Sequence, residues 1–403
     1  MIAQIILSFF ISFFVIGGIL LYFAKGGKIG LDDCKGANVN PNSFGNDGNQ
    51  KNGVAGNEGG GKCGSKSKSK PEPQKFHIKI VSRLGGAGIF SAFFFVLIII
   101  GIHTKEADYI YLPLTALPVF VMGFTEDLTR MISPKFRLLG ALVSAVLAAY
   151  FLNAYLVRID IGFIDGLFSV KAVAVIFTIF AVTGVANSFN IIDGFNGLSS
   201  AVSVIILLSL GYISFKVGDI FLMKACLILS FAIFGFFIWN YPFGKIFLGD
   251  GGAYFIGFTI AVVSVLLVDG NKAVSPWFPF LLCIYPIFET LFSMYRKEFV
   301  RKTSSFEPDG LHLHMLIYKR LVPHILGTDI KNNQLARNSA TSPFLWLLTS
   351  FSAVPALLFW NNTPALIVFA FIFIIVYVWL YKSIVDFKLW KFIKKKVKLK
   401  KPV

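Results

Sequence analysis

The sequence predicts an all-α polytopic membrane protein with about 11 transmembrane helices. Of its 403 residues, 56% are hydrophobic, and the mean hydropathy is +0.72, whereas about 45–50% of the residues in soluble domains are apolar. Apolar runs of about 17–25 residues, each long enough to span a bilayer, recur along almost the whole chain. We expect spans at residues 2–24, 84–102, 109–124, 137–155, 171–187, 200–216, 221–239, 252–268, 276–294, 344–360 and 364–381.

The first apolar run, Ile2 to Ala24, is interpreted as a membrane helix rather than as a cleaved signal peptide. It lacks a basic segment before it and a small-x-small cleavage site after it. It is also longer than the apolar region of a typical signal peptide.

The distribution of Lys and Arg predicts that the N-terminus lies outside the cell and the C-terminus inside. With this orientation the inside segments hold 32 of the 38 basic residues, an excess that is typical of cytoplasmic loops. This bias and attraction to anionic lipid account for the net charge of +17, and no nucleic-acid-binding motif is present. The inside segments are 25–83, 125–137, 188–199, 240–251, 295–343 and 382–403.

We treat residues 1–403 as a single membrane-embedded domain with three cytoplasmic additions. Residues 36–72 form a Gly-, Asn-, Lys- and Ser-rich insert, which is predicted to be disordered because it has too little apolar surface to bury. Residues 295–343 form a long loop that is expected to contact the substrate. The basic tail, 382–403, fits either an anchor on the lipid surface or a solubilising extension.

The cysteines are predicted to be free thiols and to form no structural zinc site, because no CxxC pair is present. They are Cys34, Cys63, Cys226 and Cys283.

Four polar clusters lie at span ends, and all four lie on the predicted inside face. An ionised side chain at the bilayer centre costs at least ~2.5–3.5 kcal/mol, so acids beside membrane helices mark function or lie at helix ends. The first cluster, MGFTEDLTRMISPKFR at 122–137, contains the adjacent acids Glu126 and Asp127 and the cation Lys135. Such a pair suits a divalent cation or a general base. The alternative is an ordinary acidic loop.

The second cluster is NSFNIIDGFNGLSS at 187–200, in which polar residues recur every three positions. On a helix this spacing places them along one face, where amides beside one acid suit a nucleotide or a hydrated metal. The alternative is helix capping and packing. The four residues are Asn187, Asn190, Asp193 and Asn196.

The third cluster, FLGDGGAYFIG at 247–257, holds Asp250 between glycines at the start of a span. A lone carboxylate among bare backbone N–H groups suits Mg²⁺ with a phosphate. The alternative is an N-cap, and the two roles are compatible.

The fourth cluster, FEPDGLHLHMLIYKR at 306–320, contains His312 and His314. Side chains two residues apart on a helix point away from each other. The two histidines can therefore act together only if the backbone is extended or irregular. A zinc site is the rival interpretation, but it needs further ligands. Glu289, inside an apolar run, is expected to anchor the site. Nearby basic residues would make a cationic pyrophosphate clamp: Arg301, Lys302, Lys319 and Arg320.

Taken in this order, the clusters resemble the polyprenyl-phosphate N-acetylhexosamine-1-phosphate transferase family (glycosyltransferase family 4), in its undecaprenyl-phosphate GlcNAc-1-phosphate transferase-like branch. PQKFH at 73–77, followed by SRLGG at 82–86, is similar to the family's first inside loop. GFTEDL is similar to its paired-aspartate motif, with Glu126 in place of the first Asp. NSFNIIDGFNGL, FLGDGG and the HLHM segment are similar to its other three motifs. The resemblance covers nearly all of the chain outside 36–72 and the tail.

The resemblance implies an enzyme of the bacterial inner (plasma) membrane with its active site on the cytoplasmic face. It would transfer phospho-N-acetylhexosamine from a UDP-sugar to undecaprenyl phosphate and release UMP, as the first membrane step of O-antigen- or capsule-like polysaccharide synthesis. Mg²⁺ (or Mn²⁺) is the implied cofactor. The expected partners are both substrates and the bilayer, with no nucleic acid, and a homodimer is left open. HLHM, which lacks a consecutive histidine run, argues against the phospho-MurNAc-pentapeptide transferases, which stay an alternative.

The resemblance also implies a role for each matching side chain. Glu126 and Asp127 would orient or deprotonate the lipid phosphate, and Asn190 and Asp250 would hold the metal. Asp193, counted with the catalytic acids, would line the nucleotide site. The remaining residues would bind substrate: Asn187 and Asn196 at the nucleotide, His312 and His314 at the diphosphate or sugar, and Lys75 and Lys135 as neutralising charges.

Two other classes of function remain as rivals. A secondary transporter would share the polytopic pattern, but transporters bind substrate near the bilayer midplane, whereas the polar clusters lie at one face. The second rival is a lipid- or nucleotide-binding protein without activity. It would apply if Glu126, which stands where the family usually has Asp, disables catalysis.

Overall fold

The computed structural model describes residues 1–25, 81–301, 310–325 and 333–386, and these ranges fold into helices without a strand. The predicted disordered insert at 36–72 lies outside the described residues, as do Lys75, Lys302 and most of the tail. Of the cysteines, Cys226 and Cys283 are described, and both are buried free thiols.

The described residues contain ten helical segments that are long and apolar enough to cross a membrane. This confirms the prediction of an all-α polytopic membrane protein. In the third segment, two helices follow each other almost without a break. The segments are α1 (Ile2–Ala24), α2 (Gly85–Thr104), α3 with α4 (Asp108–Thr115 and Leu117–Thr129), α5 (Pro134–Phe151), α7 (Lys171–Ile192), α8 (Leu198–Lys216), α9 (Ile220–Asn240), α10 (Gly249–Gly270), α16 (Gln334–Leu358) and α17 (Thr363–Val385).

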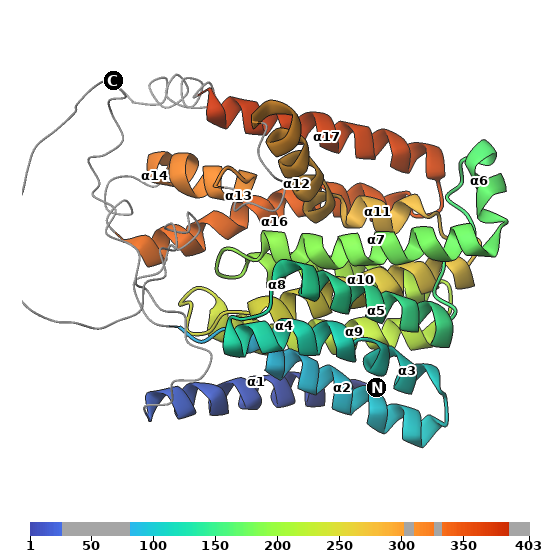
Figure 1. The fold of residues 1–403 in the computed structure, drawn as a ribbon, viewed down its shortest axis with the longest axis horizontal. Coiled ribbons are helices and arrows are strands. Elements are labelled where there is room, and N and C mark those ends of the chain that lie inside the picture. Colours follow the sequence, from blue (N-terminus) through green and yellow to red (C-terminus); the bar gives the residue numbers. More distant parts are fainter. Residues whose placement is uncertain (26–80, 302–309, 326–332, 387–403) are drawn as a thin grey trace, which may run out of the picture.

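The remaining expected span, 276–294, is not one continuous helix, and the prediction of eleven uninterrupted spans is wrong at this point. The segment is divided at Cys283 into α11 (Trp277–Leu282) and α12 (Ile284–Tyr295), which continues as a π-helical turn, η1 (Arg296–Arg301). Pro286 has no N–H to donate to the carbonyl of Leu282, so the helix is interrupted there. Figure 1 shows α12 inclined to the direction of α11.

The long helices lie side by side, and their ends alternate between two opposite ends of the molecule (Figure 1). One end carries α6 (Gly162–Phe168) and the connection between α2 and α3. The other end, called the site end here, carries all four polar clusters: the turn after α4, the loop between α7 and α8, the start of α10, and α13 (Leu313–Leu316) with η2 (Ile317–Leu321) and α14 (Val322–Ile325).

The long loop expected at 295–343 is shorter than predicted, because α16 already begins at Gln334. The side chain of Asn333 accepts a hydrogen bond from the N–H of Ala336 and caps this helix, as Asn does well. The first turns of α16 are polar, so hydropathy alone places the start of the span about ten residues too late.

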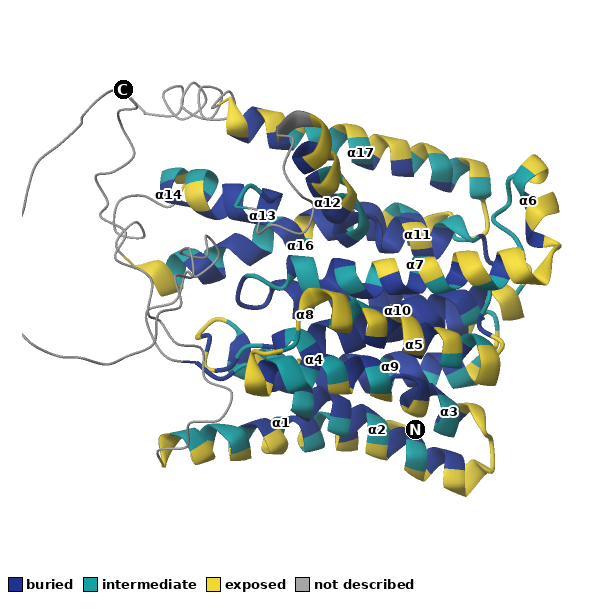
Figure 2. Ribbon diagram, viewed as in Figure 1, coloured by how far each residue is buried: buried dark blue, intermediate teal, exposed yellow. Residues whose placement is uncertain are grey.

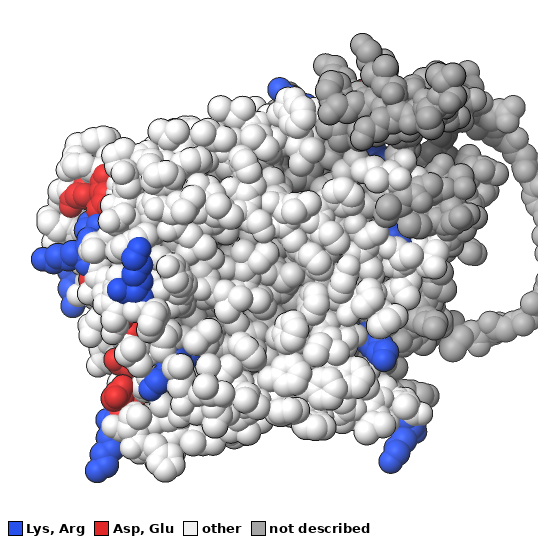
Figure 3. Space-filling view, turned by 180° about the vertical axis from the view of Figure 1, so that it is seen from behind, with Lys and Arg blue, Asp and Glu red and all other residues white. Residues whose placement is uncertain are grey.

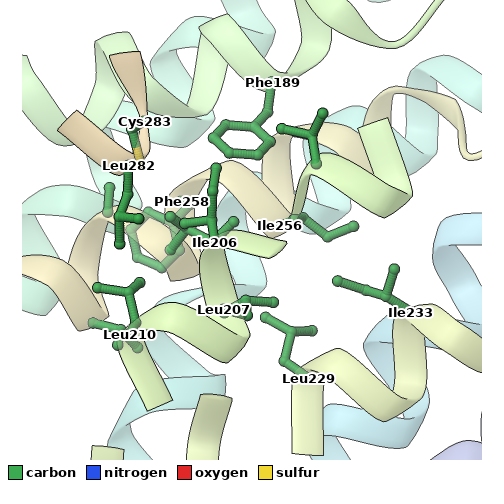
Figure 4. Close-up of a cluster of buried hydrophobic side chains, with 14 of the residues drawn as sticks. Phe189, Ile206, Leu207, Leu210, Leu229, Ile233, Ile256, Phe258, Leu282 and Cys283 are labelled. Carbon is green, nitrogen blue, oxygen red and sulfur yellow. The ribbon is translucent and has the colours of Figure 1, made fainter. Parts of the chain in front are cut away.

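Helix α10 is the centre of the bundle. In its most apolar stretch, 94% of the residues are buried, compared with 22% in α1 and α17. Figure 2 shows it in dark blue behind the outer helices. It packs against α2, α4 and α7. A buried cluster joins α10 to α7, α8, α9 and α11 (Figure 4), with Phe189, Ile206, Leu229, Phe258 and Leu282 among its members.

The charged side chains of the described residues gather at the two ends of the molecule. Between these ends the face in Figure 3 is almost entirely white, which means that uncharged side chains form a broad band across this face of the bundle. An uncharged band of this kind is what a bilayer requires of the surface that it contacts.

Candidate active site

The start of α10 is held in place by Asp127, at the end of α4. The two carboxylate oxygens of Asp127 accept the backbone N–H groups of Asp250 and Gly251, each at 2.8 Å. Gly249, with φ +77°, turns the chain into the helix, and a Cβ atom there would lie 2.1 Å from the carbonyl oxygen of Arg83. Only glycine fits this position. Because the carboxylate of Asp127 binds the N-terminus of α10, it fixes the position of the backbone at Asp250.

Asp250 is the acid around which the polar residues converge. Its Oδ2 pairs with the guanidinium of Arg137, from the first turns of α5. Its Oδ1 accepts a hydrogen bond from the amide of Asn190 at 2.8 Å. One turn further along α10, the hydroxyl of Tyr254 donates to Oδ1 of Asn187 at 2.8 Å. The structure therefore brings Asn190 and Asp250 together, and their role as metal ligands stays a prediction.

The loop between α7 and α8 is fixed by buried hydrogen bonds around Asn196. The N–H of Asn196 donates to Oδ1 of Asn338 at 2.8 Å, and its carbonyl accepts the hydroxyl of Ser342 at 2.6 Å. The next N–H, from Gly197, donates to Oδ1 of Asn240 at 2.6 Å. Asn196 is only 1% exposed, so the structure gives it a role in holding the loop and leaves little of its surface for a ligand.

Asp193 lies at the end of α7 in this same loop and keeps part of its surface exposed. Protein atoms packed around the carboxyl raise the pKa of Asp193 from an ordinary value of 3.8 to about 7, and the positive charge of Arg83 opposes this shift. Desolvation destabilises the ionised form. Arg83 also interacts electrostatically with Asp127, so it links the loop to the start of α10.

The two histidines face the same loop from α13. His312 precedes α13 in an extended conformation (φ −59°, ψ 151°), and this irregular backbone brings the imidazoles of His312 and His314 parallel, with ring centroids 5.1 Å apart. A Cβ atom on Gly194 would lie 3.6 Å from Nε2 of His314. The two imidazoles therefore stack on each other beside the loop that holds Asp193, on the irregular backbone that this arrangement was predicted to need.

Glu289 anchors this pair, as the sequence predicted. Its Oε1 lies 3.1 Å from Nδ1 of His312 and accepts the N–H of Leu313 at 2.8 Å. Its Oε2 accepts the hydroxyl of Tyr377 at 2.8 Å.

The remaining predicted residues lie at the rim of the site or outside the described part of the chain. Oε2 of Glu126 accepts the N–H of Ile132 at 2.7 Å and closes the turn after α4. Glu126 and Asp127 thus both accept backbone N–H groups. Lys135 is exposed, with no ion pair in the described part of the chain. Lys75 lies outside that part.

The sequence of this chain, compared with known proteins, has a clear family match. Residues 109–268 match the sequence model of glycosyl transferase family 4. These residues form a glycosyl transferase family 4 domain. The matched stretch runs from α3 to the end of α10 and so contains Asp127, Asn190, Asp193 and Asp250.

Curated proteins with similar sequences include two kinds of transferase by name. A probable undecaprenyl-phosphate N-acetylglucosaminyl 1-phosphate transferase of Bacillus subtilis is 27% identical over 69% of this chain and 78% of the relative. An undecaprenyl-phosphate alpha-N-acetylglucosaminyl 1-phosphate transferase of Thermotoga maritima is 29% identical, over 62% and 73%. A phospho-N-acetylmuramoyl-pentapeptide-transferase of Clostridium perfringens is 30% identical, over 49% and 65%.

The donor set at the start of α10 fits Mg²⁺. This ion typically takes one or two protein carboxylates and completes its shell with phosphate oxygens and water. Asp250 keeps 18% of its side chain exposed, and Asn190 adds an amide. Among the described residues, no three His, Cys, Asp or Glu side chains form a metal-binding group, so the fit depends on oxygens that substrate and water would supply.

Three functional candidates in this site were not predicted from the sequence. Arg137 lies two residues after Lys135, the predicted cation, and of the two only Arg137 reaches Asp250. Arg83 is part of the SRLGG segment, and Tyr254 lies one turn after Asp250. The sequence did carry one signal for them, because each of the three residues lies inside a motif at the site end.

Proposed function

We propose that this chain transfers the phospho-N-acetylhexosamine group of a UDP-sugar to undecaprenyl phosphate. An oxygen of the lipid phosphate attacks the phosphorus that carries the sugar, the bond from this phosphorus to the bridging oxygen of the diphosphate breaks, and UMP leaves with that oxygen. One phosphoanhydride replaces another, so the reaction needs no ATP. The names of the relatives in Bacillus subtilis and Thermotoga maritima support this proposal.

The observation that carries the proposal is the convergence on Asp250. A carboxylate at a helix N-terminus, with Asn190 on one oxygen and Arg137 on the other, offers both a metal ligand and a cation for a diphosphate. When Mg²⁺ is bound by Asp250 and Asn190, it supplies positive charge to the diphosphate. Arg137 is placed to pair with a phosphate oxygen, because a guanidinium matches phosphate in geometry and charge.

Asp193 is the residue that we assign to proton transfer from the lipid phosphate. Its pKa of about 7 lies near the operating pH, as a general base requires. Both oxygens of Asp127 are already taken by N–H groups of α10, so we give Asp127 a positioning role. Glu126, which closes the adjacent turn, orients the same region.

His312 and His314 complete the site on the side of the sugar or diphosphate. They lie beside the loop of Asp193 and donate hydrogen bonds when protonated. We further propose that the site end faces the cytoplasm of a bacterial inner membrane, where UDP-sugars are available, and that the reaction starts the synthesis of a cell-surface polysaccharide. The Lys and Arg distribution supports this orientation.

The test is UMP release by the purified chain with undecaprenyl phosphate, Mg²⁺ and a panel of UDP-sugars. We expect release that needs both lipid and metal, and loss of at least 99% of the rate in Asp250→Asn, because the ligand carboxylate is gone. Asp219→Asn is the matched control: Asp219 caps α9 at the opposite end, and Asn also caps helices.

The outcome also separates the alternatives. Release with UDP-MurNAc-pentapeptide alone would assign the chain to the activity that is named for the Clostridium perfringens relative. No release with any UDP-sugar, from folded protein, would refute the transferase and favour transport or binding.

A further inference from the structure

Glu289 is a buried acid whose hydrogen-bonding capacity is used on both oxygens. It is 1% exposed. Three donors converge on it from two parts of the chain: the ring of His312 and the N–H of Leu313, which are adjacent in sequence, and the hydroxyl of Tyr377 in α17. A buried carboxylate without partners would be strongly destabilising, whereas a carboxylate with several donors is stable. This arrangement therefore does more than fill space beside the histidines.

The contact with Glu289 decides which nitrogen of His312 carries the proton. The N–H of Leu313 and the hydroxyl of Tyr377 both donate to this carboxyl, which fits an acceptor-only carboxylate. The nitrogen facing Oε1, Nδ1, is then the protonated one, and in the neutral ring Nε2 is left as the acceptor. Because the ring of His314 is stacked on that of His312 with an interplanar angle of 5°, the orientation of one ring constrains the other.

We propose that Glu289 and Tyr377 are positioning residues of the phosphosugar site. Tyr377 fixes the carboxylate of Glu289, and Glu289 holds His312 in the tautomer with the proton on Nδ1, so that Nε2 is presented to the substrate. In this way α17, the last described helix, determines the geometry of a substrate-binding side chain. The substrate-binding role of His312 rests on the proposed function. The tautomer of His312 does not depend on that function.

The tautomer is measured without any substrate. In protein carrying ¹⁵N-histidine, reconstituted in lipid, the resonances of His312 are assigned by comparison with His312→Gln. We expect Nδ1 protonated and Nε2 unprotonated in the neutral ring, and a loss of this preference in Glu289→Ala. A neutral ring with its proton on Nε2 in the unsubstituted protein would overturn the proposal.

The positioning role is measured by kinetics. Glu289→Gln keeps the size of the side chain and an oxygen for Leu313, but removes the charge. We expect the KM for the UDP-sugar to rise on the order of tenfold, and about threefold in Tyr377→Phe, as the loss of charged and neutral hydrogen bonds predicts. Tyr285→Phe is the matched control: this buried hydroxyl, one turn before Glu289 on α12, has no hydrogen-bond partner within the described part of the chain. Its KM is expected to be unchanged.

A merely structural role would give a different pattern. A smaller folded fraction lowers kcat and leaves KM unchanged, and that result in Glu289→Gln would refute the positioning role. We also expect Glu289→Gln to have no further effect on KM in a His312→Ala background, since residues that act as a unit are not additive; additive effects would contradict the proposal. If the unsubstituted chain releases no UMP, the proposed function fails, while the tautomer measurement still tests the contact.

Discussion

At the scale of single residues, Asp250 is neutralised by Arg137 in the structure. A cation that pairs with a carboxylate competes with a metal for the same oxygens. We therefore expect Arg137→Gln to bind Mn²⁺ about three- to tenfold more tightly than the unsubstituted chain in the absence of nucleotide, measured by electron paramagnetic resonance titration. The expected change corresponds to the ~1 kcal/mol typical of exposed or partly exposed ion pairs.

Lys245→Gln is a suitable control for this experiment. Lys245 is also a cation at the site end, but its ammonium lies over the ring of Trp239, 5.3 Å from the centroid, and should leave Mn²⁺ binding unchanged. Equal or weaker Mn²⁺ binding by Arg137→Gln would show that Arg137 does not compete with the metal for Asp250.

The raised pKa of Asp193 leads to a second prediction at the scale of single residues, which concerns the pH dependence of stability. The folded chain holds this proton more tightly than the unfolded chain, because packing raises the pKa from 3.8 to about 7. Ionisation of Asp193 therefore destabilises the fold, by an amount that is absent below about pH 4, grows with pH, and is constant above about pH 7. Asparagine has no such penalty.

We accordingly expect Asp193→Asn to lose UMP release but to gain thermal stability, with a difference in Tm that grows between about pH 4 and pH 7 and then levels off. The measurement is thermal unfolding in detergent at a series of pH values. A gain in Tm that did not vary with pH would mean that the pKa of Asp193 is the same in the folded and unfolded chains.

At the scale of elements, α2 and α10 approach so closely that there is no room for a side chain between them. A Cβ atom on Gly86 would lie 2.4 Å from the backbone nitrogen of Gly252. Backbone atoms cannot rotate away, so Gly86→Ala should destabilise the fold by about 1–3 kcal/mol or more, as overpacking does, and lower Tm in detergent.

Gly184→Ala is the matched control for this prediction. Gly184 lies within α7, and a Cβ atom added there would have no other atom of the described residues within 4 Å beyond its own stretch of helix. Alanine is also a better helix former than glycine. The Tm of this variant should be unchanged or higher. Equal losses of Tm in both variants would exclude close packing as the cause.

The bounds of the helices were predicted well where local hydropathy determines them. They were predicted less well where packing against neighbouring helices or a single residue determines them. The extent of α4 was underestimated, because Glu126 and Asp127 are polar yet helical. The division at Cys283 depends on Pro286, which lacks an N–H for the helix; hydropathy does not register this feature. Within the site, the resemblance to the family led us to expect Asn190 and Asp250 together, and the structure brings them into contact. The reach of Arg137 to Asp250 depends on where α5 packs, which the sequence pattern does not contain.

At the scale of the whole molecule, all four polar clusters lie at one end of the bundle (Figure 1). Which end faces the cytoplasm stays a prediction from the Lys and Arg distribution. In a chain without its four cysteines, we expect Asp165→Cys, in α6, to react with a membrane-impermeant thiol reagent on whole cells. Ser133→Cys, at the site end, should react only after the membrane is opened. The reverse pattern would contradict the orientation.

The almost complete burial of α10 has a mechanical consequence. A bilayer that is too thick or too thin acts on a protein by tilting or displacing the helices that touch its acyl chains. Helix α10 has little surface of that kind, while α1 and α17 have much. The helix that carries Asp250 therefore has little contact with lipid of its own, whereas His312 is linked through Glu289 and Tyr377 to α17, which has much. Lipids of different chain length should thus alter the handling of the sugar nucleotide more than the affinity for the metal.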